Sequence, residues 1–280
     1  MKKIGFVDYY LSEWHANNYP AWIAEACSQN GFEYQVAYAW GEIETSPLDG
    51  VTSAAWCEKN GVALCASVEE LCEKSDVIMI LAPSNPEKHL EYAKAVLPYG
   101  KTTYIDKTFA PNTQIAKEIF AIAAQYGTPV FSSSALRYAE ELETEQPIRS
   151  LMVTGSGSSV DEYIVHLAEM TVKKLGVGAK QIRVEHCAKQ HYFHLCYEDD
   201  REAMMVFAPK LPYTLQMTDV NGKASYVRIK SAFFPALMAA ILRFFESSVP
   251  TVTAEETVEV MQICEGAVRA MNENEGWINL

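Results

Sequence analysis

The chain has 280 residues, which exceeds what one hydrophobic core usually organises, so two domains are expected. With 49% hydrophobic and 21% charged residues, the composition is that of a folded globular protein and excludes a mainly disordered chain. The formal net charge of −13 repels phosphates, so neither nucleic acid nor an anionic membrane surface is an expected partner.

Targeting and redox signals indicate a cytoplasmic protein. The apolar stretch at the N-terminus is broken by Asp8, so no signal peptide is expected. The longest apolar runs, residues 77–83 and 233–242, are too short to cross a bilayer as helices. The seven cysteines are scattered and contain no Cys-x-x-Cys pair, which is typical of reduced thiols.

The first part of the chain alternates strand and helix patterns. Strands are predicted at 3–7, 33–40, 62–66, 76–83, 102–105 and 129–132, and helices between them at 12–30, 54–60, 68–74, 86–97 and 112–126. Ser67 and Glu70 form a capping box at the start of the third helix. The continuous apolar run 76–83 is typical of a central parallel strand. This order predicts an α/β fold, with residues 1–137 forming a Rossmann-like doubly wound parallel sheet.

The pattern changes after Arg137, where the acidic stretch 140–145 and Pro147 predict a solvated connection. Residues 138–280 then predict a smaller α+β domain with a mostly antiparallel sheet. It has a strand at 148–154, a helix at 160–175 and several strands between 181 and 229, with Asn221-Gly222 as a type I′ hairpin turn. Closing helices at 235–247 and 254–272 are free to pack back on the first domain.

Ligands of doubly wound sheets bind beyond the carboxyl ends of the strands. Asp8, residues 83–85, Asp106, Lys107 and residues 132–134 should therefore line one crevice. Lys107 supplies a cation there that could transfer a proton or polarise a substrate oxygen. The alternative is an ordinary surface lysine.

A second candidate lies on the helix predicted at 160–175. Glu162, His166 and Glu169 are spaced four and three residues apart, so they project from one helical face. A carboxylate one turn from an imidazole can orient it and raise its basicity, as a general base requires. The alternative is an exposed amphipathic face that carries a histidine by chance.

His186, His191, His194 and Cys196 lie close together in the sequence, but their spacing matches no structural zinc pattern. In a strand, His194 and Cys196 would share a face, which permits a site without requiring one. No metal is therefore expected, and the cluster stays an open alternative.

Three motifs resemble the glucose-fructose oxidoreductase and inositol dehydrogenase family, Gfo/Idh/MocA. The first is Gly61-Val-Ala-Leu-Cys-Ala-Ser-Val-Glu-Glu-Leu71, and the second is Asp76-Val-Ile-Met-Ile-Leu-Ala-Pro83 followed by His89. The third, Asp106-Lys107-Thr108, is similar to the family's Glu-Lys-Pro. Arg137-Tyr138 and the helix from Glu162 to Leu175-Gly176 also resemble family patterns, so the resemblance covers nearly the whole chain.

This resemblance implies an NAD(P)-dependent oxidoreductase that acts on a sugar, cyclitol or similar small polyol or carbonyl metabolite. Lys107 would be the catalytic lysine, His166 the general base, and Glu162 the counterpart of a substrate-binding aspartate of the active site. The residues expected at the NAD or NADP site are Asp8, Tyr10, Ala82, Pro83, Ser84, Asn85, His89 and Asp106. Those expected to bind substrate are His15, Arg137 and Glu169.

The first turn departs from the family pattern. There the family has Gly-x-Gly-x-x-Gly, whereas this chain has Asp8, Tyr10 and Glu13 at the three glycine positions. A tyrosine obstructs the approach of a diphosphate to the backbone, and Glu13 would satisfy the helix dipole itself and repel the phosphates. Thr108 in place of proline is expected to change mainly the rigidity of its loop.

The lost glycines leave a second function open, namely a binding or regulatory member of the family that no longer binds nucleotide. The resemblance also implies a homodimer or larger homo-oligomer, formed through a face of the second domain's sheet that its own helices leave uncovered. In both functions the expected partner is a small-molecule substrate or ligand.

Overall fold

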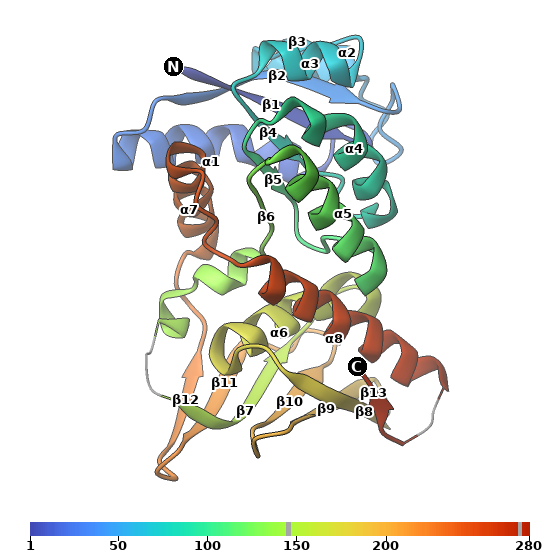
Figure 1. The fold of residues 1–280 in the computed structure, drawn as a ribbon, viewed down its shortest axis with the longest axis vertical. Helices are drawn as coiled ribbons and strands as arrows, with labels where there is room; N and C mark the ends of the chain where they lie inside the picture. Colours follow the sequence, from blue (N-terminus) through green and yellow to red (C-terminus); the bar gives the residue numbers. More distant parts are fainter. Residues whose placement is uncertain (144–146, 274–275) are drawn as a thin grey trace. The chain divides into compact units, whose positions relative to one another are not determined.

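A computed structural model describes residues 1–143, 147–273 and 276–280 (Figure 1). The chain forms two compact units. The first comprises Met1–Ala110, Gln114–Ser133 and Phe234–Thr253, and the second comprises Pro111–Thr113, Ser134–Phe233 and Ala254–Leu280. The predicted division at residue 137 differs from these units chiefly because residues 234–253 return to the first unit. Of the connection predicted at 140–145, residues 144 and 145 lie outside the described part.

The described residues of the first unit contain a six-stranded parallel sheet, in the order β3-β2-β1-β4-β5-β6. Its strands are β1 (Lys2–Asp8), β2 (Tyr34–Gly41), β3 (Ala63–Leu64), β4 (Val77–Ile80), β5 (Thr103–Ile105) and β6 (Val130–Phe131). The apolar run that contains β4 lies in the middle of the sheet, and Ile78, Met79 and Ile80 are fully buried. This confirms the predicted doubly wound α/β fold. The strand order reverses between β1 and β4, so the carboxyl ends of these two strands border the crevice that such folds use for ligands.

The helices of the first unit begin and end largely where local signals predict. They are α1 (Trp14–Asn30), α2 (Ser53–Asn60), α3 (Val68–Lys74), α4 (His89–Val96) between the 3-10 turns η1 (Pro86–Lys88) and η2 (Leu97–Tyr99), α5 (Thr113–Tyr126) and α7 (Phe233–Ser247). Ser67 Oγ accepts a hydrogen bond from the backbone N–H of Glu70 at 3.2 Å and so caps α3, as predicted. The Glu70 carboxylate reaches the N–H of Ala66 instead of that of Ser67.

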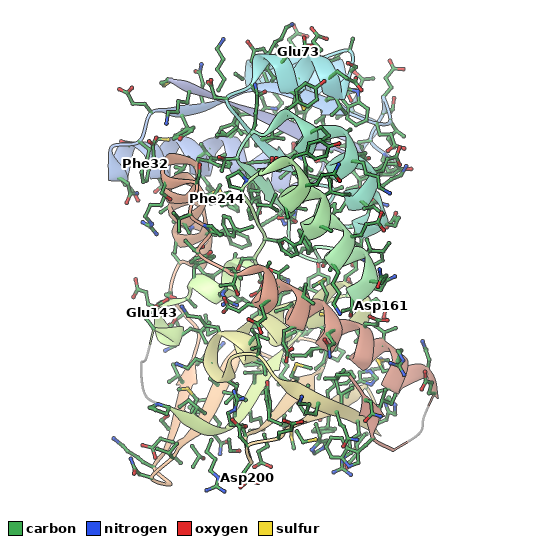
Figure 2. The ribbon with its side chains drawn as sticks, in the orientation of Figure 1. Phe32, Glu73, Glu143, Asp161, Asp200 and Phe244 are labelled. Atoms are coloured by element: carbon green, nitrogen blue, oxygen red, sulfur yellow. The ribbon has the colours of Figure 1, made fainter. Side chains whose placement is uncertain are left out.

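Helix α7 returns to the first unit because its aromatic side chains pack there. Phe244 of α7 is labelled in Figure 2. Its ring lies 4.8 Å from that of Phe131 of β6, and Phe234 stacks on Trp22 of α1 at 4.9 Å. Phe244 and Phe131 are fully buried. Burial of large aromatic rings of this kind contributes roughly 2 kcal/mol each, so the closing helix completes the core of the first unit.

The second unit is built on a mixed sheet in the order β12-β11-β7-β10-β9-β8-β13. Its elements are η3 (Ala135–Tyr138), η4 (Glu140–Leu142), β7 (Ile148–Gly155), α6 (Val160–Leu175), β8 (Ala179–Cys187), β9 (Gln190–Tyr197), β10 (Glu202–Phe207), β11 (Thr214–Asp219), β12 (Ala224–Arg228), α8 (Ala254–Glu273) and β13 (Ile278–Asn279). Strands β7 and β10 are parallel and the other described pairs are antiparallel, which confirms the mostly antiparallel sheet.

The two faces of this second sheet differ. Helices α6 and α8 contact strands of the sheet, and the alternate residues Leu151 and Val153 of β7 are buried. Ser150 and Met152, which point the other way, are only partly buried. They help to line a shallow hollow with Met204 and Trp277.

The hairpin between β11 and β12 forms where predicted, but its turn type differs. Gly222 has a φ of +81°, whereas Asn221 is not among the residues with positive φ. A type I′ turn requires positive φ at both central residues. The N–H of Gly222 donates to Asp219 O at 3.0 Å, and the N–H of Asp219 donates to Lys223 O. This is the three-residue loop with a left-handed glycine, so the type I′ prediction is wrong.

None of the helices in the described part is both long and apolar enough to cross a membrane.

Candidate functional site

Lys107 follows β5 directly, at the carboxyl edge of the first sheet. Its side chain is partly buried, and Nζ donates a hydrogen bond to the carbonyl oxygen of Pro83 at 3.1 Å. Pro83 belongs to the turn after β4, the neighbouring strand. The lysine is therefore anchored across two adjacent strand ends, where a ligand of a doubly wound sheet binds.

The turns around Lys107 have an unusual backbone. Thr108 has a φ of +57° and Ala82 a φ of +45°, values that residues with a side chain rarely adopt. Proline is locked near −65° and cannot take the conformation of Thr108. The replacement of the family's proline therefore changes the path of the chain, and the expectation that it mainly changes rigidity is corrected.

His89 ties the same two turns together. Its Nε2 lies 2.7 Å from Leu81 O and its Nδ1 lies 3.0 Å from Phe109 O, and the side chain is fully buried. Burial lowers the pKa of the imidazole. These contacts give His89 a structural role, and its predicted part in cofactor binding stays a prediction.

Asp106 is fully buried beside Lys107. Its Oδ1 accepts hydrogen bonds from the hydroxyls of Tyr19 at 3.2 Å and Tyr104 at 3.3 Å. Burial and the charge of Asp106 raise the pKa of Tyr19 well above its usual value. Tyr19 therefore stays a neutral donor to Asp106, and the Tyr104 hydroxyl also lies 3.0 Å from Ser133 O.

His15, on the first turn of α1, lies between two carboxylates. Its Nδ1 is 3.2 Å from Glu13 Oε2 and its Nε2 is 3.7 Å from Asp106 Oδ2. Burial lowers the pKa of the imidazole, but Asp106 and Glu13 together outweigh it and raise the pKa above 6.5. The structure thus brings His15, predicted to bind substrate, beside Asp106 at the carboxyl edge of the first sheet.

Glu13 caps the N-terminus of α1, as the sequence predicts. Its carboxylate accepts hydrogen bonds from the N–H of His15 at 2.8 Å and from the N–H of Ala16. The residue is only 4% exposed. In a dinucleotide-binding fold these N–H groups would face the phosphates, so here an internal carboxylate has replaced them.

Asp8, at the end of β1, takes two further N–H groups. Its Oδ1 accepts from Tyr9 N at 2.7 Å and from Ala82 N at 3.0 Å. Burial and the neighbouring Glu13 raise the pKa of the Asp8 carboxyl well above its usual value. With Asp8 and Glu13 at two of the glycine positions, the residues at this turn do not fit a dinucleotide diphosphate.

Glu42 follows β2, where an acidic residue often binds the ribose of a dinucleotide. Its Oε1 lies 2.6 Å from Lys88 Nζ, and its Oε2 accepts from the Tyr92 hydroxyl at 2.6 Å. Both carboxylate oxygens are therefore engaged within the chain.

The other predicted cofactor residues lie on the same turns. Tyr10 is partly buried on the turn after β1, Ser84 is exposed after β4, and Asn85 donates from Nδ2 to Glu87 at 2.9 Å. Whether they contact a cofactor stays a prediction.

His166 of α6 lies in the second unit. Its Nδ1 is 2.7 Å from the hydroxyl of Ser134, and its side chain is partly buried. Glu162, one turn earlier, accepts a hydrogen bond from Ser158 at 2.9 Å and lies on the capped first turn of the helix. Ser134 is thus one partner of the imidazole, and the predicted role of Glu162 in orienting it stays a prediction.

Arg137 and Glu169 form a buried ion pair in the second unit. Arg137 Nη1 lies 3.0 Å from Glu169 Oε2, and its Nη2 contacts Glu256 of α8. Glu169 also accepts from the N–H of Ser134 at 2.9 Å. This network joins η3 to α6 and α8, which gives both residues a structural role beside the predicted substrate-binding one.

The first unit thus collects Asp8, His15, Pro83, Asp106 and Lys107, and the second unit collects Arg137, His166 and Glu169. The sequence analysis missed several of their partners, namely Tyr19, Tyr104, Ser134 and Glu256. Tyr19 could have been found, because it lies four residues after His15 and shares its helical face. Glu256 could not, because it lies 119 residues from Arg137.

The histidine cluster lies on β8 and β9. His186 and His191 are cross-strand partners with their Nδ1 atoms 2.8 Å apart. Among the described residues, no group of three or more histidine, cysteine or carboxylate side chains is placed to hold a metal ion.

Comparison with known proteins finds a family match for part of the chain. Residues 46–134 match the sequence model of the Gfo/Idh/MocA family, described as an oxidoreductase family with an NAD-binding Rossmann fold. The predicted family resemblance is confirmed. An oxidoreductase of Escherichia coli K12, YhhX, whose activity is uncharacterised, is 34% identical over 65 residues. The matched segment covers 23% of this chain and 19% of YhhX.

Solved structures share the fold over nearly the whole chain. The apo scyllo-inositol dehydrogenase of Lactobacillus casei has a TM-score of 0.76 at 12% identity, covering 99% of this chain and 98% of its own. UDP-N-acetylglucosamine 3-dehydrogenase GnnA of Acidithiobacillus ferrooxidans has a TM-score of 0.73 at 13% identity, and the match covers 96% of each chain. GenD2 of gentamicin A biosynthesis, solved in complex with NAD, has a TM-score of 0.76 at 10% identity. The match covers 100% of this chain and 97% of GenD2. At these identities the likeness concerns the fold alone.

Proposed function

We propose that this chain acts on a hydroxyl or carbonyl group of a sugar, cyclitol or similar small polar metabolite. The first candidate function is an oxidoreductase that uses NAD or NADP, with Lys107 and His166 as its catalytic pair and Glu162 as a substrate-binding residue of the active site. The observation that carries it is Lys107, which keeps its family position and has its ammonium anchored to Pro83 O. The family match and the inositol and sugar dehydrogenases among the fold neighbours support the substrate class.

Lys107 would hold and polarise the reacting oxygen of the metabolite. An ammonium group offers three donors, and only one is used by Pro83 O at 3.1 Å. His15 and Asp106 beside it supply further charged and polar groups. The lysine can therefore stabilise negative charge that develops on an oxygen during proton transfer.

His166 would take the proton of the substrate hydroxyl. Its Nδ1 is hydrogen-bonded to the Ser134 hydroxyl at 2.7 Å, and the second bond of a histidine ring fixes its orientation and tautomer. The roles assigned to Lys107 and His166 concern proton handling alone. The turn after β1, with Asp8 and Glu13 at glycine positions, does not fit the diphosphate of the nucleotide.

That misfit supports the second candidate function, a binding or regulatory protein on the same scaffold that has lost nucleotide binding. It would keep the metabolite site. The observation that favours it is Glu13, whose carboxylate caps α1.

One set of measurements separates the two functions. The protein is mixed with sugars and cyclitols in the presence of NAD or NADP, and reduced nicotinamide is followed by absorbance; each metabolite is also titrated alone by calorimetry. Turnover supports the first function, and metabolite binding without turnover supports the second. Neither turnover nor binding would contradict the proposed metabolite site.

We also infer that a second copy of the chain covers the open face of the second sheet. Met152, Met204 and Trp277 line the hollow there, and Trp277 is 45% exposed. A dimer or larger assembly is expected by light scattering, and Met204→Asp should shift it toward the monomer. A wild-type monomer would contradict this inference.

The cytoplasm is proposed as the location of the protein. All seven cysteines are free thiols, which is typical of a reducing compartment. Cell fractionation with an antibody tests this, and recovery outside the cytoplasm would contradict it.

A further inference from the structure

Two carboxylates take the backbone donors at the crevice of the first sheet. Glu13 accepts from the N–H groups of His15 and Ala16, and Asp8 accepts from those of Tyr9 and Ala82. Four N–H groups are thus satisfied by two acidic side chains. Asp8 and Glu13 are 1% and 4% exposed, so both belong to the interior.

The four N–H groups lie where this class of fold binds a dinucleotide. Tyr9 and Ala82 follow β1 and β4, which pair in the sheet where the strand order reverses. His15 and Ala16 form the first turn of α1. In this class of fold a dinucleotide crosses the same two strand ends, and its diphosphate accepts from N–H groups at the start of the first helix. Glu13 therefore takes the donors of a phosphate acceptor, and Asp8 takes donors at the two strand ends that a dinucleotide crosses.

The turn that carries them is built into the unit. The Ser12 hydroxyl donates to Asp49 at 2.8 Å, and the Ser46 hydroxyl donates to the carbonyl oxygen of Ser12 at 2.8 Å. The N–H of Ile43 donates to Tyr9 O at 2.9 Å. The turn after β1 is therefore bonded to the segment after β2, over the side of the sheet where an adenosine would lie.

Charge adds to this obstruction. Glu13 is already paired with the imidazole of His15, and Asp106 lies on the other side of that ring. A diphosphate would bring further negative charge beside Glu13 and Asp106, which are only 4% and 0% exposed. Bringing unpaired like charges into such a place is strongly unfavourable.

We propose that the side chains of Asp8 and Glu13 take the place of a dinucleotide's diphosphate and so block the dinucleotide-binding site. The chain then binds neither NAD nor NADP at the start of α1. This inference concerns the nucleotide and is independent of the metabolite site. If it is right, the second candidate function is the one that applies.

The test measures binding of NADH and NADPH by nicotinamide fluorescence, with no need for turnover. The wild-type protein should show no saturable binding up to about 1 mM. Asp8→Gly, Tyr10→Gly and Glu13→Gly together restore the Gly-x-Gly-x-x-Gly spacing, and the triple variant should bind at least about tenfold tighter than the wild type.

A second variant protects the test against a loss of folding. Glu13→Ser keeps a side chain that can cap the helix but removes the charge, so it should show a smaller gain in nucleotide affinity. Glu25→Ser, which removes an exposed carboxylate further along α1, is the matched control and should show no gain. Circular dichroism and thermal unfolding establish that each variant is folded.

Wild-type binding of either nucleotide with a micromolar dissociation constant would overturn the inference. So would folded Glu13→Ser and triple variants that gain no affinity. Failure of the proposed function would look different, because it would appear as no metabolite binding in the calorimetric titration, whatever the nucleotide does.

Discussion

Two turns at the carboxyl edge of the first sheet differ in how far they keep the Gfo/Idh/MocA pattern. After β5, Asp106 and Lys107 stand where the family has an acidic residue and a lysine. After β1, the three glycine positions hold Asp8, Tyr10 and Glu13. The carboxyl groups of Asp8 and Glu13 accept hydrogen bonds from backbone N–H groups. Both turns are fixed by strands that pair in the same parallel sheet. The comparison teaches that strand pairing maintains the scaffold, while the side chains at each strand end can keep or lose a ligand independently.

The largest expected effect lies at the retained turn. Under the first candidate function, Lys107→Met should lower turnover by roughly a thousandfold, about 4 kcal/mol of transition-state stabilisation, because it removes the charge proposed to lie beside the reacting oxygen. Steady-state kinetics with the best metabolite measures it. Lys117→Met, at an exposed position of α5, is the control and should leave turnover unchanged. Equal turnover of the two variants would remove Lys107 from the catalytic machinery.

The same turn also differs from the family in its backbone. Thr108→Pro restores the family's residue, yet it should lower the free energy of unfolding by about 3 kcal/mol, because proline cannot adopt a φ of +57°. Urea unfolding measures this change. Thr108→Gly, which tolerates positive φ, should stay close to the wild type. A stable proline variant would show that the turn can take the family's path.

At the altered turn the expected effect is smaller. Glu13→Ala removes the cap of α1 and should lower the free energy of unfolding by about 1 kcal/mol. Ser67→Ala at the start of α3 provides a second cap of known geometry for comparison. If Glu13→Ala leaves stability unchanged while Ser67→Ala lowers it, the contacts of Glu13 do not stabilise the helix.

The smallest effect is a change in pH dependence. The pKa values of Asp8 and His15 are raised in the folded state, so the folded protein holds protons that the unfolded chain releases. The stability contributed by these two protons is therefore lost as pH rises, from about 4 upward for Asp8 and from about 6.5 upward for His15. Asp8→Asn mimics the protonated carboxyl and should flatten this decline in urea unfolding measured from pH 5 to 8. An unchanged slope would contradict the raised pKa of Asp8 in the folded state.

Local sequence signals located the elements of both units well. Helix α6 begins at Val160 and ends at Leu175, as predicted, and β4 lies centrally because its residues are apolar throughout. The bounds of helices and strands depend on residues that are close in sequence, so capping residues and hydrophobic periodicity predict them directly. The turn at Asn221 was misassigned because a turn type depends on two dihedral angles that the Asn-Gly pair does not fix.

By itself, the sequence determined the order of strands and helices, the strand-end position of Lys107 and the loss of the three glycines, because each of these is a matter of residue type and spacing. Only the tertiary structure decided what replaced the glycines. Asp8 accepts a hydrogen bond from Ala82, 74 residues later in the chain, and the Tyr19 hydroxyl donates to Asp106, 87 residues later. Such contacts arise when parallel strands far apart in the chain bring their ends together, and no local pattern records which side chains then share the available hydrogen bonds.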